Sequence, residues 1–537
     1  MTQRLANGGK VTLYGWPNTI FIACCMKLGI ELMNESKDNP YFIGVNIDNT
    51  SVYAIAVSDV GRTLAESSCP FDLGKHQSRK GFSEQPCEAW WQATCFALGH
   101  LTRILRNEGF SSKLLTGISV SSPPGTLAVL NRAGQSIYPA MMADDVRAEE
   151  QAVRLNMIGQ KHVKKVGVNF RATDAIAKIV WFKEAEPDLY EHAVFAHQAD
   201  YVLGCLKGKI DITDPTIAAT TGFDPCDNCW PDWLDYDMYL SVRERLPLIG
   251  QMGQCVGQIT ADAAKATGLP AGLPVVLGCN SQTASFLCSG VKNSGDFFTI
   301  FDDVMRFDGI SNSLIRYPHN IVKMNRLPDK DWFFSTQANT GTEWINMWFN
   351  EQFALENIVQ IDQLLPTRYL AYPNVRHGEV FPFNTNSAEG FISPATDNRL
   401  VQFAACVQGT ALLERMIYAT IDEMANNSGS GAIYTIGPWC KSDIWMQCRA
   451  DITERTIHRL PYKRGADFGT AILAAMGTKY DSLKEASDVM VHVEKSFFPN
   501  PARMAVFKEC YTNFLTTMEE QGYLTFPEQN GQNNRHV

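Results

Sequence analysis

Two apolar runs, residues 41–45 and 52–57, enclose the short polar turn 46–51. A second turn, residues 58–61, leads into a third short run of strand type. Strand-forming runs joined by short polar turns predict antiparallel hairpins. A turn of this kind can hold phosphate groups with its backbone N–H groups. The pattern therefore predicts a strand–turn–strand unit whose first turn is a candidate phosphate loop.

The alternation of strands, turns and helices continues along the chain. Residues predicted to be helical are 86–108, 176–183, 281–290, 401–424 and 466–477. Short runs that predict strands are residues 114–121, 126–131, 273–278, 295–302 and 433–436. Each half of the chain thus repeats strand–turn–strand units that are followed by helices. This pattern predicts an α/β architecture in two copies, with the cleft between the copies as the default ligand site.

The composition indicates a large protein with two domains. At 537 residues the chain exceeds the size of one ordinary hydrophobic core. Its net charge of −10 argues against a nucleic-acid partner, whose phosphates it would repel.

Fifteen cysteines, scattered along the chain, are typical of reduced thiols in a cytoplasmic protein. One CxxC pair, Cys226 and Cys229, has no second pair at zinc spacing, so we expect no metal site there. The apolar stretch 19–32 is too short to span a membrane.

The order of several short motifs resembles the FGGY carbohydrate kinases, most closely their xylulokinase-like branch, over residues 41–480. The motifs that carry the resemblance are residues 81–85 with Trp90 and Trp91, 145–147, 200–201, 221–224, 268–274, 441–451 and 469–471. The resemblance implies two actin-like (ribonuclease H-like) ATPase domains with a central cleft. It places the sugar-side domain at residues 41–290 and the nucleotide-side domain at 291–480. Residues 1–40 are then an N-terminal extension, and residues 481–537 are a C-terminal helix with a loose tail.

By the same resemblance, the ligands are a small sugar or polyol, ATP and magnesium, and a homodimer is left open. A buried aspartate of the family acts as general base on a sugar hydroxyl. That position is occupied by Ser281 here, with Gln282 beside it on the sugar side. A serine hydroxyl has no useful basicity near neutral pH unless another group activates it. The simplest alternative is that Ser281 caps the following helix, since serine is a good N-cap residue.

Both phosphate loops carry side chains that oppose a nucleotide phosphate. The first loop aligns with Asn46, Asp48, Asn49 and Thr50. It has an amide where the family has a carboxylate, and an acid where the family has a glycine. In the second loop, Asp302 and Asp303 replace a glycine and a threonine. Two like charges about 4 Å apart repel by about 4 kcal/mol at an effective dielectric of about 20. Aspartates that hold a divalent metal, and through it a phosphate, are one alternative, and a solvated acidic turn is another.

The adenine-side loop and the sugar side are changed as well. The adenine-side loop aligns with Gly437, Trp439 and Ser442. Pro438 and Trp439 stand where the family has glycines, so the Trp439 ring either fills the nucleotide space or stacks on a base. On the sugar side Asp145 and Arg147 remain. Asp145 is expected either to accept hydrogen bonds from a polyol or to form a structural ion pair with Arg147.

The changes favour a catalytically impaired member of the family, a pseudokinase with a sugar-binding or regulatory role. Several nucleotide-handling motifs are altered together, while motifs expected to hold the fold persist. The alternative is an active xylulokinase-like sugar kinase with a rearranged active site.

Overall fold

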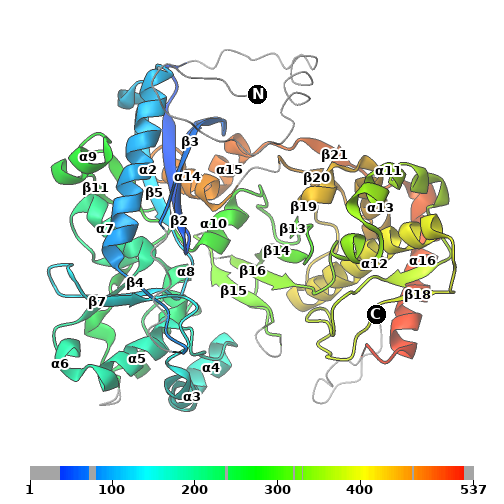
Figure 1. Cartoon of the computed structure of the whole chain (residues 1–537), viewed down its shortest axis with the longest axis horizontal. Coiled ribbons are helices and arrows are strands. Elements are labelled where there is room, and N and C mark those ends of the chain that lie inside the picture. Colours follow the sequence, from blue (N-terminus) through cyan, green and yellow to red (C-terminus); the bar gives the residue numbers. More distant parts are fainter. Residues whose placement is uncertain are drawn as a thin grey trace, which may run out of the picture. The chain divides into compact units, whose positions relative to one another are not determined.

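The computed structural model describes residues 37–71, 80–235, 240–317, 321–328, 331–461 and 465–524 (Figure 1). Its first large sheet has six strands in the order β11-β12-β5-β1-β2-β3. These strands are β1 (Tyr41–Ile47), β2 (Ser51–Ser58), β3 (Thr63–Pro70), β5 (Leu115–Ser121), β11 (Cys255–Gln258) and β12 (Pro274–Val276). Strands β1, β2 and β3 are antiparallel neighbours, whereas β5 runs parallel to β1 and β12 runs parallel to β5.

The second large sheet has seven strands in the order β15-β16-β14-β13-β19-β20-β21. These are β13 (Phe297–Ile300), β14 (Arg306–Ser311), β15 (Lys323–Arg326), β16 (Trp332–Gln337), β19 (Ile433–Ile436), β20 (Ile457–Arg459) and β21 (Lys495–Phe497). Strands β13, β14 and β16 are antiparallel neighbours, and β19 and β20 continue the sheet in parallel. The first sheet has the same succession of three antiparallel and two parallel strands. The predicted α/β architecture in two copies is therefore confirmed.

A smaller four-stranded sheet, in the order β4-β7-β6-β8, belongs to the first half of the chain. Its strands are β4 (Glu84–Gln85), β6 (Leu127–Leu130), β7 (Ser136–Met141) and β8 (Val194–His197). It shares one hydrophobic cluster with α3 (Glu149–Ile158) and α5 (Ala175–Ala185). Two short sheets pair β9 (Ile212–Thr213) with β10 (Leu248–Ile249), and β17 (Leu370–Tyr372) with β18 (Phe391–Ser393).

Long helices cover one face of each large sheet. The helices α2 (Cys87–Asn107) and α7 (Gln198–Lys207) pack on the first sheet, and α12 (Arg399–Ala425) and α13 (Asp443–Thr453) on the second. The other helices are α4 (Gln160–Val166), α6 (Pro187–Tyr190), α8 (Pro215–Ala218), α9 (Ala261–Thr267), α11 (Glu351–Asn357), α15 (Leu483–Met490) and α16 (Pro501–Glu520). Each large sheet thus buries the apolar side chains of this face under helices of its own half of the chain.

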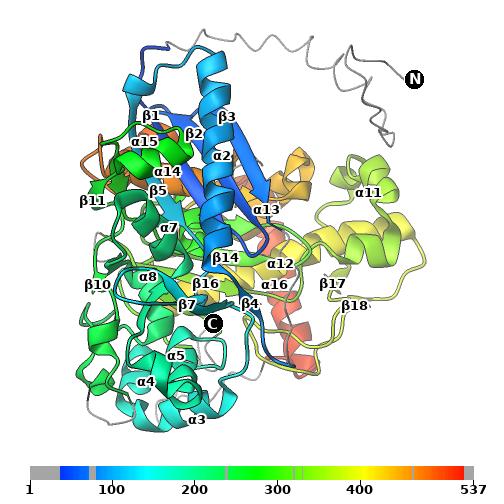
Figure 2. The same cartoon turned by 60° about the vertical axis from the view of Figure 1, so that its left-hand side comes forward.

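The opposite faces are covered by two helices that the halves exchange. Helix α14 (Ala466–Met476), from the second half, packs on Phe42 and Val57 of the first sheet. It appears in orange among the blue strands in both views (Figure 1, Figure 2). Helix α10 (Ser281–Leu287), from the first half, packs Phe286 on Phe333 of the second sheet, with ring centroids 4.7 Å apart. The first half therefore completes its core only with a helix that comes much later in the chain.

The contact between these two helices needs a residue without a side chain. A Cβ atom added to Gly469 of α14 would lie 1.7 Å from the backbone oxygen of Ala284 in α10. A Cβ atom on Gly44 of β1 would lie 2.0 Å from the backbone oxygen of Asp467. Glycine at these positions lets α14 approach both β1 and α10 at backbone distance.

The predicted helices and strands occur with shifts of a few residues at their ends. Helix α10 ends at Leu287, before the end of the predicted helix 281–290. The predicted C-terminal helix corresponds to α15 and α16, and the predicted loose tail lies mostly outside the described residues. The predicted N-terminal extension also lies outside them except for residues 37–40. The domain boundaries at 290 and 480 stay predictions.

Candidate functional site

Helix α10 begins at the predicted base position, Ser281. The N-cap residue is Asn280, whose side-chain oxygen accepts a hydrogen bond from the Thr283 N–H at 2.7 Å. The interpretation of Ser281 as the helix cap is therefore wrong. Asparagine is as good an N-cap as serine, and the cap fell on the preceding residue. The Ser281 hydroxyl is left to bond elsewhere.

That hydroxyl donates to the Asn46 side-chain oxygen at 2.6 Å. The same oxygen accepts from the Ser121 hydroxyl at 3.0 Å, and Ser121 accepts from Thr470 at 2.7 Å. The cluster of Ser281, Asn46, Ser121 and Thr470 is named the neutral cluster below. It joins α10, the end of β1, the end of β5 and α14. All four side chains are uncharged, so the cluster offers neither a general base nor a carboxylate for a metal.

Sequence reasoning placed Ser281 and Asn46 at this site but missed Ser121 and Thr470. Ser121 is the last residue of β5, the parallel neighbour of β1, so its position at the same sheet edge as Asn46 was open to prediction. Thr470 had no such signal, because it reaches the cluster through the exchange of α14. Its hydroxyl bond to Ser121 links residues 349 positions apart.

The first predicted phosphate loop is a tight turn between β1 and β2. The Asp48 N–H donates to the Ser51 carbonyl at 2.8 Å, and the Asp48 carboxylate accepts from the Asn49 N–H at 2.6 Å. A phosphate in this turn would need the Asn49 N–H as a donor. That N–H is already bonded to the Asp48 carboxylate. Asn49 and Thr50 are exposed, and the Asn49 carbonyl accepts from the Gln85 amide at 2.9 Å.

The second predicted phosphate loop, Asp302 and Asp303, follows β13. The Asp302 side chain accepts from the Asp303 N–H at 2.8 Å, and the Asp302 carbonyl accepts from the Thr342 N–H at 2.9 Å. Partial burial raises the pKa of Asp303, and the negative charges of Asp302 and Glu343 raise it further. The acids already repel one another here, so an added phosphate would increase the repulsion.

The adenine-side loop is a short 3₁₀-helix, Pro438–Lys441, between β19 and α13. The Trp439 ring packs against Trp445, with ring centroids 5.9 Å apart, and joins the core of the second half. Ser442 caps α13 by accepting from the Trp445 N–H at 3.2 Å. The backbone of Gly437 lies close to that of Phe301, since a Cβ atom on Gly437 would lie 1.9 Å from the Phe301 carbonyl oxygen. The Trp439 ring thus packs against the protein itself, and its stacking on a base stays a prediction.

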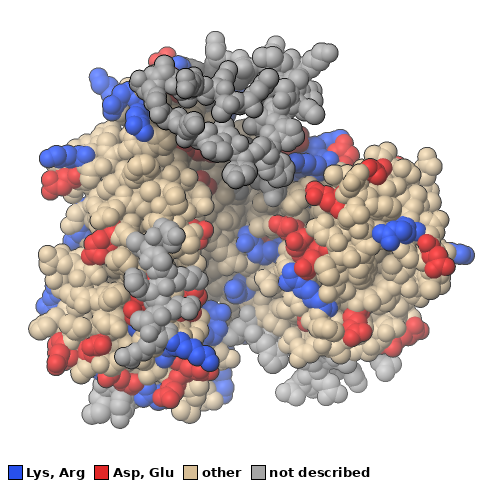
Figure 3. All heavy atoms as spheres, viewed as in Figure 1, with Lys and Arg blue, Asp and Glu red and all other residues tan. Residues whose placement is uncertain are grey.

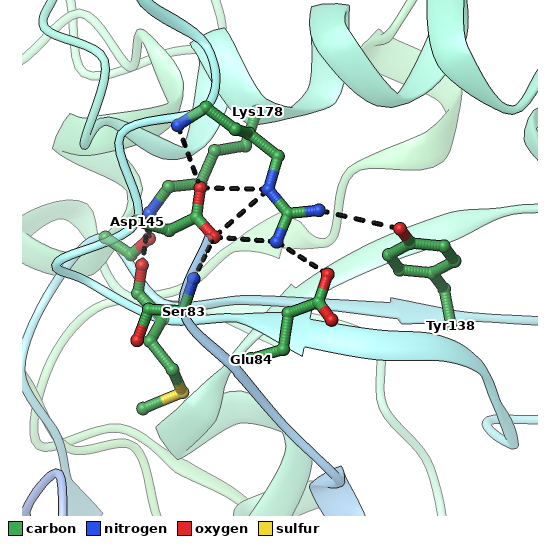
Figure 4. A network of polar contacts seen from close by, with 8 residues as sticks. Ser83, Glu84, Tyr138, Asp145 and Lys178 are labelled. Carbon is green, nitrogen blue, oxygen red and sulfur yellow. Dashed lines mark hydrogen bonds and ion pairs between the residues drawn. The ribbon is translucent and has the colours of Figure 1, made fainter. Parts of the chain in front are cut away.

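On the sugar side, Asp145 and Arg147 form a buried ion pair (Figure 4). The Arg147 Nη2 atom lies 2.7 Å from Asp145 and 2.6 Å from Glu84, and the guanidinium stacks 3.8 Å over the Phe82 ring. The other Asp145 contact is the Ser83 N–H at 2.7 Å. Both side chains of the pair are fully buried. The structural ion pair, one of the two sequence alternatives, is therefore present, and a hydrogen bond from a polyol to Asp145 stays a prediction.

Lys178 of α5 reaches the loops beside this ion pair (Figure 4). Its ammonium donates to the carbonyl oxygens of Gly125 and Met142 at 2.8 and 2.6 Å. Burial lowers the pKa of Lys178 to about 8. Sequence reasoning missed this residue, because a lysine within an apolar helix gives no sign of the loops it will hold.

Gln282, the last predicted sugar-side residue, points toward the second sheet. Its amide donates to the Ser335 hydroxyl of β16 at 2.6 Å. Ser281 and Gln282 therefore face different partners at the start of one helix. Ser281 meets the first half of the chain, and Gln282 meets the second.

The residues present do not fit a complex of ATP and magnesium. The position of the metal carboxylate holds the Asn46 amide, and three acids stand in the phosphate turns. The Trp439 ring lies where the adenine-side glycines would be. Within the described residues, no three His, Cys, Asp or Glu side chains come together as a metal site, and Cys226 and Cys229 are free thiols.

Comparison with known proteins identifies the family. Residues 41–288 match the N-terminal domain of the FGGY family of carbohydrate kinases, and residues 331–478 match its C-terminal domain. The chain belongs to the FGGY family. It therefore has the two-domain actin-like ATPase fold that the motifs implied. The resemblance to FGGY carbohydrate kinases is confirmed.

Relatives match over most of their length. A xylulose kinase of Bacillus subtilis (strain 168) is 25% identical over 500 residues, which are 89% of this chain and 97% of that protein. An L-xylulose/3-keto-L-gulonate kinase of Escherichia coli (strain K12) is 23% identical and covers 88% of this chain and 96% of its own. A xylulose kinase structure from Rhodospirillum rubrum superposes with a TM-score of 0.74 at 21% identity, covering 90% of this chain and 99% of that one. In the described part of this FGGY protein, no helix is both long and apolar enough to cross a bilayer.

Proposed function

We propose that this FGGY-family chain is a pseudokinase that binds a small sugar or polyol without ordinary phosphoryl transfer, in a sugar-binding or regulatory role. The observation that carries the proposal is the 2.6 Å hydrogen bond between Ser281 and Asn46. It joins, in one uncharged pair, the position of the general base and the position of the metal carboxylate. Loss of a general base alone typically costs about 10²–10⁴-fold in rate.

Charge supports the same proposal. Asp48, Asp302 and Asp303 stand in the two turns where a kinase would receive phosphates. Catalysis of phosphoryl transfer depends on stabilising the negative charge of the transferring group. Acids in these turns would destabilise that charge instead. ATP and magnesium, the ligands of the family's reaction, are therefore not expected to bind tightly. A cytoplasmic location and a homodimer stay expectations from the sequence.

The second candidate is an active xylulokinase-like kinase with a rearranged active site. One observation favours it: a buried carboxylate is connected to α10. The Thr216 hydroxyl donates to Asp214 at 2.6 Å and accepts from the Asn280 N–H at 2.9 Å. Burial raises the pKa of Asp214 to about 7, in the range of a general base. However, Asp214 also caps α8 by accepting from the Ile217 N–H, which explains its position without catalysis.

Thermal unfolding of the full chain tests the proposal. We expect the melting temperature to rise with a ketopentose, a polyol or an aldonate, and not with Mg-ATP alone. No rise with any sugar or polyol would contradict a sugar-binding role.

A coupled assay for ADP release tests the loss of phosphoryl transfer in parallel. We expect no release above background with any sugar. Sugar-dependent release that Ser281→Ala abolishes and Ser285→Ala preserves would overturn the proposal. Ser285 is the matched control, because its hydroxyl donates to the Ser281 carbonyl within the same helix, at 2.8 Å.

A further inference from the structure

One face of the second sheet changes from apolar to charged along its strands. Side chains that lie opposite one another in antiparallel strands share a face, and so do residues two apart in one strand. Phe333 of β16 lies opposite Ile310 of β14, and Ser335 lies opposite Asp308. On the other side, Ser335 lies opposite Lys323 of β15. The row Lys323, Ser335 and Asp308 is therefore the polar continuation of an apolar face.

Helix α10 lies along this face in a defined direction. Phe286 packs on Phe333 at the apolar part, with ring centroids 4.7 Å apart. One helical turn earlier, Gln282 bonds Ser335 at 2.6 Å. The start of α10, where Ser281 stands, is thus the end that meets the charged row. The charged row belongs to the surroundings of the candidate sugar site.

Two further cations adjoin the row. Arg306 lies two residues before Asp308 on β14, and its Nη2 atom is 2.9 Å from the Asp308 carboxylate. Arg171, from the first half of the chain, pairs with Asp174 at 3.2 Å. Lys323 lies within electrostatic range of both arginines. Lys and Arg side chains are visible near the middle of the face in Figure 3, around the strands β14–β16.

The charges of this cluster do not balance. Asp308 offsets Arg306, and Asp174 offsets Arg171. Lys323 is exposed, and among the described residues no hydrogen bond or ion pair engages its ammonium. Surrounding protein atoms desolvate part of this exposed side chain and lower its pKa. The positive charges of Arg171 and Arg306 lower it further, and the carboxylates of Asp174 and Asp308 offset only part of this shift. A ligand anion beside Lys323 would relieve this repulsion between cations.

We propose that Lys323, with Arg306 and Arg171 beside it, forms a subsite for the carboxylate of a sugar acid whose hydroxyl groups reach Gln282 and Ser281. This inference rests on the proposed sugar-binding function and names the substrate class. The polar groups at the start of α10 suit a polyhydroxy chain, and the cations suit one negative charge at its end. A nucleotide is a poor occupant, because Asp302 and Asp303 stand in the phosphate turn of the same half.

Calorimetric titration of the full chain tests the inference with D-gluconate and D-glucitol, which share a six-carbon polyol skeleton and differ in charge. We expect gluconate to bind about tenfold more tightly, which corresponds to one favourable ion pair of about 1.4 kcal/mol. Lys323→Gln should remove this preference and leave glucitol binding unchanged. Lys209→Gln is the control, because Lys209 is an exposed lysine that pairs with Asp211 at 3.1 Å.

Each other outcome overturns the inference in a recognisable way. Equal binding of the two ligands would refute the anion subsite and leave the proposed sugar-binding function standing. Binding of neither ligand would refute both. A gluconate preference that survives Lys323→Gln would place the anion elsewhere. Tighter binding of D-glucose 6-phosphate than of gluconate would assign the cations to a phosphate and refute the sugar acid.

Discussion

At the scale of single residues, the neutral cluster replaces charge with hydrogen bonds between uncharged groups. Asn46 accepts from two hydroxyls, those of Ser281 and Ser121. A carboxylate introduced at Ser281 would lose this donor and would point at an amide oxygen. The acids of the phosphate turns would still oppose a triphosphate. Restoring chemistry should therefore need several changes at once.

We expect Ser281→Asp alone to produce no sugar-dependent ADP release. Combining it with Asn46→Asp, Asp48→Gly, Asp302→Gly and Asp303→Thr restores the family's residue at these four positions of the phosphate loops. This combined variant should raise the rate of release by at least about 10²-fold, the typical contribution of a general base. A coupled ADP assay with a panel of sugars measures both. Release by the single variant would show that the acidic turns do not obstruct ATP.

The buried pair of Asp145 and Arg147 should be costly to break. Arg147→Met leaves the Asp145 carboxylate buried without its cation, so we expect a loss of about 3–5 kcal/mol in the free energy of unfolding. Chemical denaturation measures this loss. The control is Arg154→Met, because the Arg154–Glu184 pair is largely exposed and should change stability by less than about 1 kcal/mol. Equal effects of the two variants would contradict a structural role for the buried pair.

Asp200 should make stability depend on pH. Burial raises the pKa of Asp200 to about 8, from 3.8 in an exposed setting. The folded state therefore keeps this proton while the unfolded state loses it, and stability falls as the pH rises from about 4 to about 8. We expect Asp200→Asn to gain stability relative to the unaltered protein across this range, measured by denaturation at pH 5 and pH 8. The exposed Asp188→Asn should show no such trend, and a parallel trend in both would refute the assignment.

At the scale of elements, the exchange of α10 and α14 determines how the site is assembled. Thr470 reaches the neutral cluster only because α14, from the second half, packs on the sheet of the first half, whereas Ser281 meets Asn46 within its own half. The contact depends on Gly469, whose missing side chain allows α14 to touch α10 at backbone distance.

Gly469→Ala should therefore destabilise the protein by more than about 3 kcal/mol, in the range of severe overpacking. The matched control is Gly99→Ala inside α2, where the nearest heavy atom to the added Cβ is 3.8 Å away. This control should be neutral or stabilise by up to about 1 kcal/mol, because alanine favours helix over glycine. Thermal melts of both variants decide the point. A mild effect at Gly469 would mean that α14 can shift without loss of packing.

At the scale of the whole molecule, the exchanged helices should couple the folding of the two halves. A shortened chain of residues 37–290 keeps the six strands of the first sheet but lacks α14, so Phe42, Ile55 and Val57 lose their cover. We expect this fragment to show no cooperative unfolding transition by circular dichroism, and the same fragment with residues 465–478 fused at its end to regain one. A cooperative transition in the unfused fragment would show that the first half folds independently.

The sequence was sufficient for the fold because the signals were local and repeated. Short apolar runs around polar turns identified the strand–turn–strand units, and helical spacing identified α2, α12 and α14. Motif order then identified the family. The sequence suggested Ser281 as the N-cap of α10, whereas the N-cap is Asn280. Both residue types are good N-caps, and only the backbone geometry selects one.

What the sequence by itself determined is the kind of residue at each functional position: serine for the base, amide for the metal carboxylate, acids in the phosphate turns. Only the tertiary structure decided what these residues contact. Ser281 bonds Asn46 across 235 positions, Trp439 packs on Trp445, and Lys323 comes within electrostatic range of Arg171 from the other half. The physical reason is that residue identity fixes charge and hydrogen-bonding capacity locally. The partner that satisfies them is chosen by how distant sheets and helices pack.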